Sequence, residues 1–162
     1  MKNLTLLSVL ALALAACQGT PPTSRTGTPS FYASMAKADA TVDAAMARDM
    51  INAYRRNKGL PTLALDPELQ AAAEAEARAM AAADRPSSAD AFKARLASAG
   101  YKAPAANLSA GYHTLAEAFS GWRQSAPHNA NMLNKSARRM GIATAYAPGS
   151  KYKVYWALVL AE

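Results

Sequence analysis

The sequence predicts an α+β protein folded as a three-layer α-β-α sandwich with a mainly antiparallel sheet. Three observations predict this class. Four segments after residue 40 have the apolar spacing of amphipathic helices, the C-terminal part alternates as strands do, and the final strand is apolar on both faces. A strand without a polar face belongs inside a sheet that is covered on both sides.

The first predicted helix covers residues 41–58. Its apolar stripe repeats every four residues and comprises Val42, Met46, Met50 and Tyr54. Gly59 follows the stripe, and a residue without Cβ readily adopts the left-handed conformation that ends a helix. We therefore expect the first helix to end at this glycine.

The next three helix starts carry capping signals. Asp66 can cap the free amides of a helix with Pro67 at its first position, and this helix is expected to extend to residue 83. A second start lies at residues 87–90, and Gly100 is its predicted stop. Residues 114–117 have the full capping-box pattern, followed by an apolar stripe that includes Trp122. The prediction is therefore four helices.

The C-terminal part predicts a β-hairpin. Apolar residues alternate with small ones over residues 140–146, and the turn signal Ala-Pro-Gly-Ser follows at 147–150. The second strand, residues 152–160, is the one with two apolar faces. It is therefore expected near the centre of the sheet.

Size and charge restrict the possible functions. A chain of 162 residues, less a leader and a tether, holds one core. Its 18 Lys and Arg against 11 Asp and Glu give a net charge of +7, which favours an anionic surface nearby. For an exported protein we expect that surface to be envelope lipid or polymer and not nucleic acid. A dispersed basic surface that only maintains solubility is the other interpretation, and it is the one we prefer.

The N-terminus has the features of an export signal. Lys2 gives a positive start, and residues 4–16 are apolar but too short to span a bilayer. Residues 14–17, Leu-Ala-Ala-Cys, resemble the lipobox of bacterial lipoproteins, in which the cysteine receives a diacylglyceryl group. Cys17 is also the only cysteine, which excludes an intramolecular disulfide. We expect cleavage after residue 16 and lipidation of Cys17.

The lipidated cysteine is followed by a predicted tether. Residues 17–38 begin with a run of Gly, Thr, Pro and Ser without apolar periodicity, and the folded domain is expected at residues 39–162. In proteobacterial lipoproteins a residue other than Asp after the cysteine resembles a signal for the outer membrane, and Gln18 fits it. The expected location is therefore the cell envelope, with the outer membrane favoured over the inner one.

Several motifs appear in an order that resembles the CAP superfamily (cysteine-rich secretory proteins, antigen 5 and pathogenesis-related proteins), in its bacterial, cysteine-poor branch with SCP-like domains. The segments that carry the resemblance are INAYR at 51–55, GLPTL at 59–63, LDPEL at 65–69, RLASAGY at 95–101, GW at 121–122 and SAPHNANML at 125–133. The resemblance implies an α-β-α sandwich, in agreement with the class predicted above.

The resemblance also implies a cavity with two His and two Glu, which most of this sequence lacks. The Glu of the family's "GEN" motif falls on Ala106, and the strand His aligns with Tyr155. The other His is missing from residues 83–87, and the acidic position after the tryptophan is Ser125. Since one imidazole needs further ligands to hold a metal, we expect no metal and no other cofactor.

His128 is the one member of the family pattern that remains. It is a candidate acid or base, with Glu76 or Glu117 as the partner carboxylate, or a neutral residue whose ring organises a loop by hydrogen bonds. Glu117 can instead be explained as the third residue of a capping box. Glu76 can instead lie at the edge of its apolar stripe, with its carboxylate reaching solvent. Further candidates for lining the cavity or organising its loops are Asn107, Trp122, Asn129 and Asn131.

Three basic pairs are candidates for contact with anionic lipid or polymer, although solvated faces produce the same pattern. They are Arg55 with Arg56, Arg138 with Arg139, and Lys151 with Lys153. The sequence leaves three functions open: binding of a protein, cell-wall or lipid ligand without catalysis, which we prefer, hydrolysis (a protease) that uses His128, and carriage of a lipid or sterol between helices. It predicts no particular ligand or oligomeric state.

Overall fold

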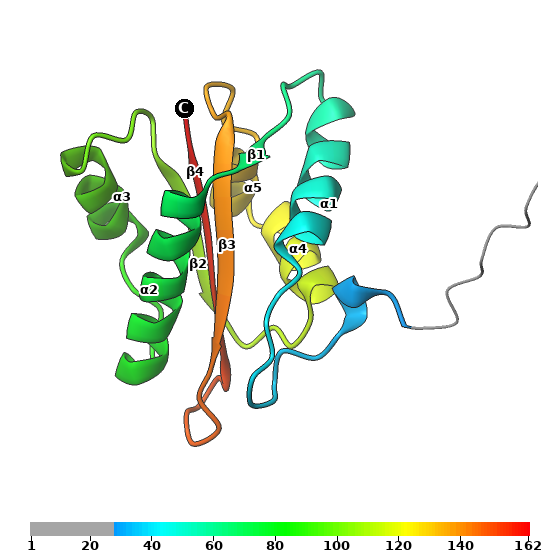
Figure 1. The fold of residues 1–162 in the computed structure, drawn as a ribbon, viewed down its shortest axis with the longest axis vertical. Helices are drawn as coiled ribbons and strands as arrows, with labels where there is room; N and C mark the ends of the chain where they lie inside the picture. The colour runs from blue at the N-terminus through cyan, green and yellow to red at the C-terminus, as the bar shows by residue number, and fades with distance from the viewer. Residues whose placement is uncertain (1–27) are drawn as a thin grey trace, which may run out of the picture.

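The computed structural model describes residues 28–162, so Cys17, Gln18 and the leader lie outside the described residues. Five α-helices, a short 3-10 helix and four strands form this part of the chain (Figure 1). In chain order they are η1 Ser30–Tyr32, α1 Ala44–Arg56, β1 Ala64–Leu65, α2 Pro67–Ala83, α3 Ala89–Ser98, β2 Ala105–Ala110, α4 Leu115–Gln124, α5 Ala126–Met132, β3 Arg139–Tyr146 and β4 Val154–Ala161. None of the described helices has both the length and the hydrophobicity required to cross a bilayer.

The sheet has the strand order β1-β3-β4-β2. β4 pairs antiparallel with β3 on one side and with β2 on the other, and only the two-residue β1 runs parallel to its neighbour. Every residue of β4 is buried, because helices cover both faces of the sheet. The predicted hairpin and the mainly antiparallel sheet are confirmed.

Two helical layers enclose the sheet. Figure 1 shows α2 and α3 on one side and α1, α4 and α5 on the other. Alternate residues of β4 divide between the two cores: Trp156 and Leu158 pack with α1, α4 and α5, whereas Tyr155 and Ala157 pack with α2 and α3. The three-layer α-β-α sandwich is therefore confirmed.

The capping signals of three helices place their starts as predicted. The Asp66 side chain accepts hydrogen bonds from the amides of residues 68 and 69, and the Ser88 side chain accepts one from residue 91. Thr114 and Glu117 form both hydrogen bonds of a capping box. These side chains satisfy the amides that the first helical turn leaves free.

The first helix differs from its prediction in the face that it buries. The helix spans Ala44–Arg56, and its buried residues are Ala47, Ile51, Asn52 and Arg55. Met46, Met50 and Tyr54, the predicted core stripe, are only partly buried. Asn52 explains part of the difference, because its amide donates to the carbonyl of Leu63 (2.9 Å) and accepts from its N–H (2.7 Å). A polar residue thus occupies the interior by serving as a partner for loop backbone.

Four elements were not predicted: α5, β2, the two-residue β1 and the 3-10 helix η1. The prediction of four helices is wrong, because residues 126–132 form a separate helix α5 after Ser125 interrupts the chain with extended dihedrals. The strand β2, which pairs with β4 along its whole length, was also missed. The folded part also begins before residue 39, the expected boundary, since Met35 is buried and Phe31 packs against the core.

Candidate functional site

His128 lies within α5, on the sheet face covered by α1, α4 and α5. Its side chain is partly buried, and this burial lowers the pKa of His128, so the neutral imidazole is favoured. Within residues 28–162 the ring makes no hydrogen bond, whereas the main-chain carbonyl accepts one from Nδ2 of Asn107 (3.0 Å). The alternative in which the ring organises this segment by hydrogen bonds is therefore not observed.

Asparagines attach α5 to its surroundings. Nδ2 of Asn131 donates to the carbonyl of Ala106 (2.8 Å) and to Oδ1 of Asn107 (3.0 Å), which joins α5 to β2. Oδ1 of Asn129 accepts a hydrogen bond from the Tyr54 hydroxyl (3.0 Å), which joins α5 to α1. Asn107 is fully buried. The amides, rather than the imidazole, hold the short helix in place.

Trp122 is a core residue beside this helix. It is fully buried, and its Nε1 donates to Oγ of Ser109 on β2 (3.1 Å). Its ring meets Trp156 edge to face, with centroids 6.1 Å apart. The indole therefore packs α4 onto the sheet and does not line an open cavity.

Glu76 lies on the opposite face of the sheet from His128. It belongs to α2, is 3% exposed, and forms an ion pair with Arg95 of α3. Neither the groove near His128 nor an escape to solvent, the two positions expected for this carboxylate, is observed. Since the sheet separates Glu76 from His128, the predicted acid–base pair of these residues does not form.

Glu117 is used at the start of α4. One oxygen of its exposed carboxylate accepts hydrogen bonds from the amides of His113 (2.7 Å) and Thr114 (3.3 Å). These are the contacts of a capping box. The structure therefore brings neither candidate carboxylate into contact with His128.

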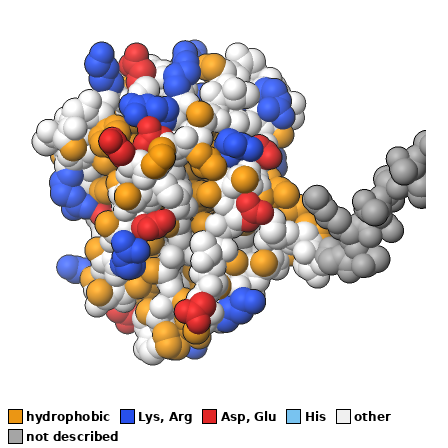
Figure 2. Space-filling view, in the orientation of Figure 1, with side chains coloured by type: hydrophobic (Ala, Val, Ile, Leu, Met, Phe, Trp, Pro, Cys, Tyr) orange, Lys and Arg blue, Asp and Glu red, His pale blue; other side chains and the backbone are white. Residues whose placement is uncertain are grey.

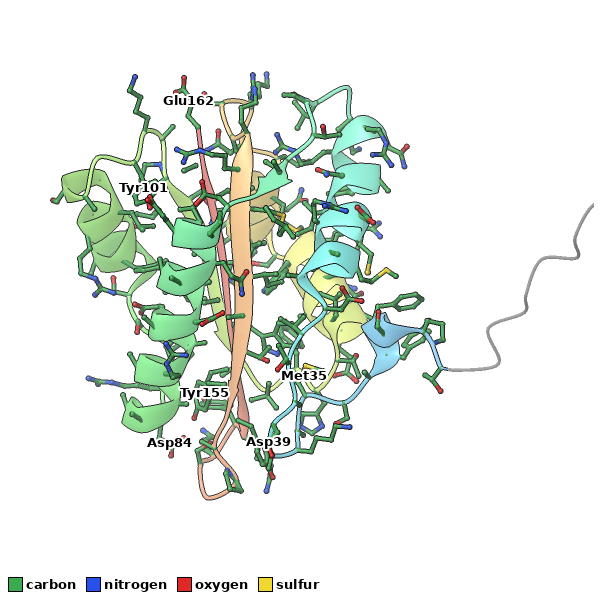
Figure 3. All side chains as sticks on the ribbon, in the orientation of Figure 1. Met35, Asp39, Asp84, Tyr101, Tyr155 and Glu162 are labelled. Atoms are coloured by element: carbon green, nitrogen blue, oxygen red, sulfur yellow. The ribbon has the colours of Figure 1, made fainter. Side chains whose placement is uncertain are left out.

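Tyr155 and Asp84, in the two segments where the resemblance implies the family's histidines, contact each other. Tyr155, aligned with the strand His, is fully buried, and its hydroxyl donates to Oδ1 of Asp84 (2.5 Å). Asp84 follows α2, in the segment where the other His was expected, and Figure 3 shows the two side chains at the same end of the molecule. Burial and Asp84 raise the pKa of Tyr155, which keeps the hydroxyl protonated as a donor. No pattern in the sequence predicts this contact between distant residues.

Ala106, which the resemblance aligns with a family Glu, contributes no ligand for a divalent metal. Ala106 is fully buried in β2 and has no donor atom in its side chain. In the described part of the chain, no group of three or more His, Cys, Asp and Glu side chains is placed to hold a metal ion. The residues present thus do not fit the metal that the family resemblance implies.

The basic pairs differ from one another in the structure. Arg55 is fully buried and donates to the carbonyls of residues 61, 132, 134 and 137, so its predicted role in contacting anionic polymer is wrong. Arg139 pairs with Asp66 and donates to the carbonyl of Glu162. Figure 2 shows basic and acidic side chains interspersed over one face of the molecule.

A groove between α1 and α4 was not predicted. Its volume is about 430 Å³, and it is lined by Met50, Ala53, Tyr54, Asn57, Lys58, Phe119 and Arg123. Tyr54 and Phe119 meet edge to face at 6.0 Å, and the Arg123 guanidinium lies 5.1 Å from the Tyr54 centroid and 5.7 Å from that of Phe119. The sequence pattern placed Tyr54 in a core stripe, whereas the structure places it at this groove. The spacing of Phe119 and Arg123, four residues apart on one helix face, was the available signal.

Comparison with solved structures supports the fold. A cysteine-rich secretory protein from Staphylococcus aureus aligns with 74% of this chain at 21% identity and a TM-score of 0.60, and an extracellular protein containing an SCP domain from Bacillus anthracis aligns with 74% at 19% identity and 0.60. The present chain covers only 38% and 40% of these two proteins. It therefore corresponds to one part of each.

A third similar structure is close to this domain in size. An outer surface protein from Borrelia burgdorferi aligns with 73% of this chain and 90% of its own length, at 13% identity and a TM-score of 0.62. At these identities the likeness shows the fold alone. No protein with a curated description matches the chain.

Family membership follows from the sequence match together with this fold. Residues 48–160, which include all five α-helices in part or whole and all four strands up to residue 160, match the model described as CAP, the cysteine-rich secretory protein family. The match extends over the motifs that carried the resemblance. The chain therefore belongs to the CAP family.

Proposed function

We propose that this chain is a lipid-anchored binding protein of the bacterial cell envelope, and that its CAP domain does not catalyse hydrolysis. The observation that carries the proposal is the hydrogen bond between Tyr155 and Asp84. Tyr155 stands where the resemblance implies one histidine, and Asp84 lies in the segment where it implies the other, so a hydrogen-bonded pair takes the place of reactive groups. His128, the remaining family residue, has neither candidate carboxylate beside it.

The sequence of the N-terminus supports the anchor. Residues 1–16 have the pattern of an export signal, and Cys17 ends a lipobox-like segment. Two or more acyl chains on one residue give stable attachment, unlike a single myristoyl chain. The similar proteins from Bacillus anthracis and Borrelia burgdorferi are described as extracellular and outer surface proteins, which supports an envelope location. Gln18 favours the outer membrane.

Membrane fractionation with mass measurement tests the anchor. The full chain is expected in the membrane fraction, with an N-terminal peptide that begins at an acylated Cys17. The variant Cys17→Ala should lose the acyl mass and leave the membrane fraction. An unacylated native chain with another N-terminus would overturn this part of the proposal.

The binding role is tested by screening and substitution together. The purified full chain in detergent should bind one class among peptides, peptidoglycan fragments and phospholipid vesicles, and should cleave none of them. A cleavage activity that His128→Ala abolishes, with an unchanged melting temperature, would establish the hydrolase instead. We expect neither a bound cofactor nor binding of nucleic acid.

A lipid carrier is the second candidate, and the groove between α1 and α4 favours it. Met50, Tyr54 and Phe119 offer apolar surface, and Arg123 and Lys58 place positive charge beside it, without an acidic residue in the lining. An anionic lipid would match this combination. Mass spectrometry of the extract from the purified chain should then detect a lipid, and Phe119→Ala should reduce its amount while Phe31→Ala does not.

A further inference from the structure

The edge of the sheet at β3 is only partly covered. The two-residue β1 pairs with β3 at residues 139 and 140 and then ends. In Figure 1, β3 lies at the front of the view, and β1 meets it only near the end away from the β3–β4 turn. The edge beyond residue 140 therefore depends on side chains, solvent or a partner for its backbone hydrogen bonds.

The pairing register shows which backbone groups point outward. The N–H of Ala147 donates to the carbonyl of Lys153, in register with the β3–β4 ladder. Since hydrogen-bonded pairs alternate along an antiparallel ladder, the odd-numbered residues of β3 bond to β4. Even-numbered residues therefore direct their N–H and C=O groups away from β4. The carbonyl of Met140, which accepts from the amide of Asp66 (2.9 Å), agrees with this alternation.

A side chain covers the first outward position after β1. Nε2 of Gln70 donates to the carbonyl of Ile142 (2.9 Å), and the Ile142 N–H donates to Oε1 of Gln70 (3.1 Å). The amide of Gln70 thus reproduces both hydrogen bonds that a neighbouring strand would make. In the part of the chain that the structure describes, the outward groups of Thr144 and Tyr146 have no such partner.

A hollow borders this open segment. It has a volume of about 260 Å³ and is lined by Ala40, Thr41, Val42, Gln70, Glu74, Arg78, Ala143 and Thr144. Ala40 and Ala143 have small side chains, which leaves space for a larger one from outside. The lining also includes charged side chains of α2. Nη1 of Arg78 lies 3.7 Å from Oε2 of Glu74.

We propose that an extended peptide segment of a partner protein binds along residues 143–146 of β3 and adds a strand to the sheet. The N–H and C=O groups of Thr144 and Tyr146, which have no partner within residues 28–162, supply directional hydrogen bonds, and the hollow accepts one partner side chain. An extended backbone offers the complementary donors and acceptors, which a sugar or a lipid chain does not offer at this spacing. This inference rests on the proposed binding role and names its partner class.

The test uses peptides selected from a displayed library of random octapeptides against the full chain in detergent. Hydrogen exchange of the amides of Thr144 and Tyr146 should slow when a selected peptide is added. Alternate N-methylation of the peptide, which removes its backbone donors along one edge, should abolish binding. Selected peptides that leave both amides unprotected, or a library that yields no binder, would overturn the proposal.

Two substitutions at residue 144 give a matched pair. Thr144→Pro removes the outward N–H but no hydrogen bond to β4, and should weaken peptide binding roughly tenfold, about the effect of one lost hydrogen bond and added bulk at the edge. Thr144→Val keeps the N–H and should bind as the unaltered chain does. Equal binding by both variants would contradict the inference. If Thr144→Pro does not fold, the exchange measurement on the unaltered chain remains decisive.

A third variant extends the edge. Gln70→Ala uncovers the outward groups of Ile142 and should tighten peptide binding severalfold, because two further hydrogen bonds become available. A dimer of the unaltered chain that Thr144→Pro dissociates would assign the edge to a second copy and overturn the peptide partner. Failure of the proposed lipid anchor can be distinguished from failure of this inference. An unacylated chain that still binds peptide at the β3 edge would contradict the anchor and leave the inference intact.

Discussion

At the scale of single residues, Arg55 shows how far the role of a charge depends on its surroundings. Its side chain is 0% exposed and donates to four main-chain carbonyls: one in the loop after α1, one at the last residue of α5 and two in the segment after α5. Arg56, its neighbour in sequence, is exposed. A pair of basic residues in a sequence therefore does not indicate a basic surface until the buried face of the helix is known.

We predict that Arg55→Met destabilises the fold by about 3 kcal/mol or more, because buried carbonyls lose their donors together. Arg56→Met is the matched control and should change the free energy of unfolding by no more than about 0.5 kcal/mol. Urea unfolding monitored by tryptophan fluorescence measures both. Equal effects would show that the Arg55 contacts contribute little.

His128 predicts a pH dependence of stability. Burial lowers its pKa in the folded state, so below the reference pKa of about 6.5 the unfolded chain binds the proton more readily. The contribution of the neutral imidazole to the free energy of unfolding is complete above about pH 6.5. It is lost as the pH falls from about 6.5 toward the folded-state pKa. The lowered pKa values of Asp43 and Asp66 act below about pH 4, which leaves the range from pH 5 to 7.5 to the imidazole.

Substitution isolates this contribution. His128→Gln should flatten the change in unfolding free energy between pH 7.5 and pH 5, while the comparison of both chains at pH 8 corrects for altered packing. An unchanged slope in the variant would mean that His128 is not the group that titrates. The expected difference follows from the direction of the shift alone.

At the scale of elements, the sequence predicted those with local signals. Asp66, Ser88 and Thr114 marked helix starts through capping that is complete within four residues, and the two-faced apolar strand marked β4. β2 has the sequence Ala-Ala-Asn-Leu-Ser-Ala, with no β-branched or aromatic residue, and is a strand because β4 pairs with it. α5 is too short for helical periodicity to be recognised.

The contact between α2 and β3 depends on one glycine. A Cβ at Gly141 would overlap the backbone of Leu69 and Gln70, which cannot move as a flexible side chain does. Gly141→Ala is therefore expected to cost about 2–3 kcal/mol through overpacking. Gly149 in the hairpin turn faces open space, and Gly149→Ala should stay within about 0.5 kcal/mol. A shift in melting temperature that is equal in the two variants would contradict this close packing.

At the scale of the whole molecule, contacts between distant segments escaped prediction. Asp84 and Tyr155 are 71 residues apart in the chain, and the sequence showed only that histidines were missing from the family positions. Glu76 was expected beside His128 or at an edge open to solvent, but it is buried and paired with Arg95, which reaches it only because α3 packs beside α2. Local sequence patterns therefore predicted the layers of the fold. The contacts made by the candidate site residues could be identified only from the three-dimensional structure.

The hydrogen bond between Tyr155 and Asp84 joins the end of α2 to β4. Tyr155→Phe should destabilise the fold by about 1–2 kcal/mol, since Asp84 loses a donor and the buried ring keeps its shape. Tyr152→Phe is the control, because the Tyr152 hydroxyl has no hydrogen bond among the described residues. If both variants unfold at the same urea concentration as the parent, the pair does not stabilise the fold.

The central claim is that this CAP domain binds a ligand and has lost the metal centre that the family resemblance implies. Zinc titration of the purified full chain by calorimetry, with elemental analysis of the same sample, tests the claim most directly. The account predicts no tightly held zinc and no saturable binding at low micromolar concentration. One tightly held zinc ion per chain would contradict it.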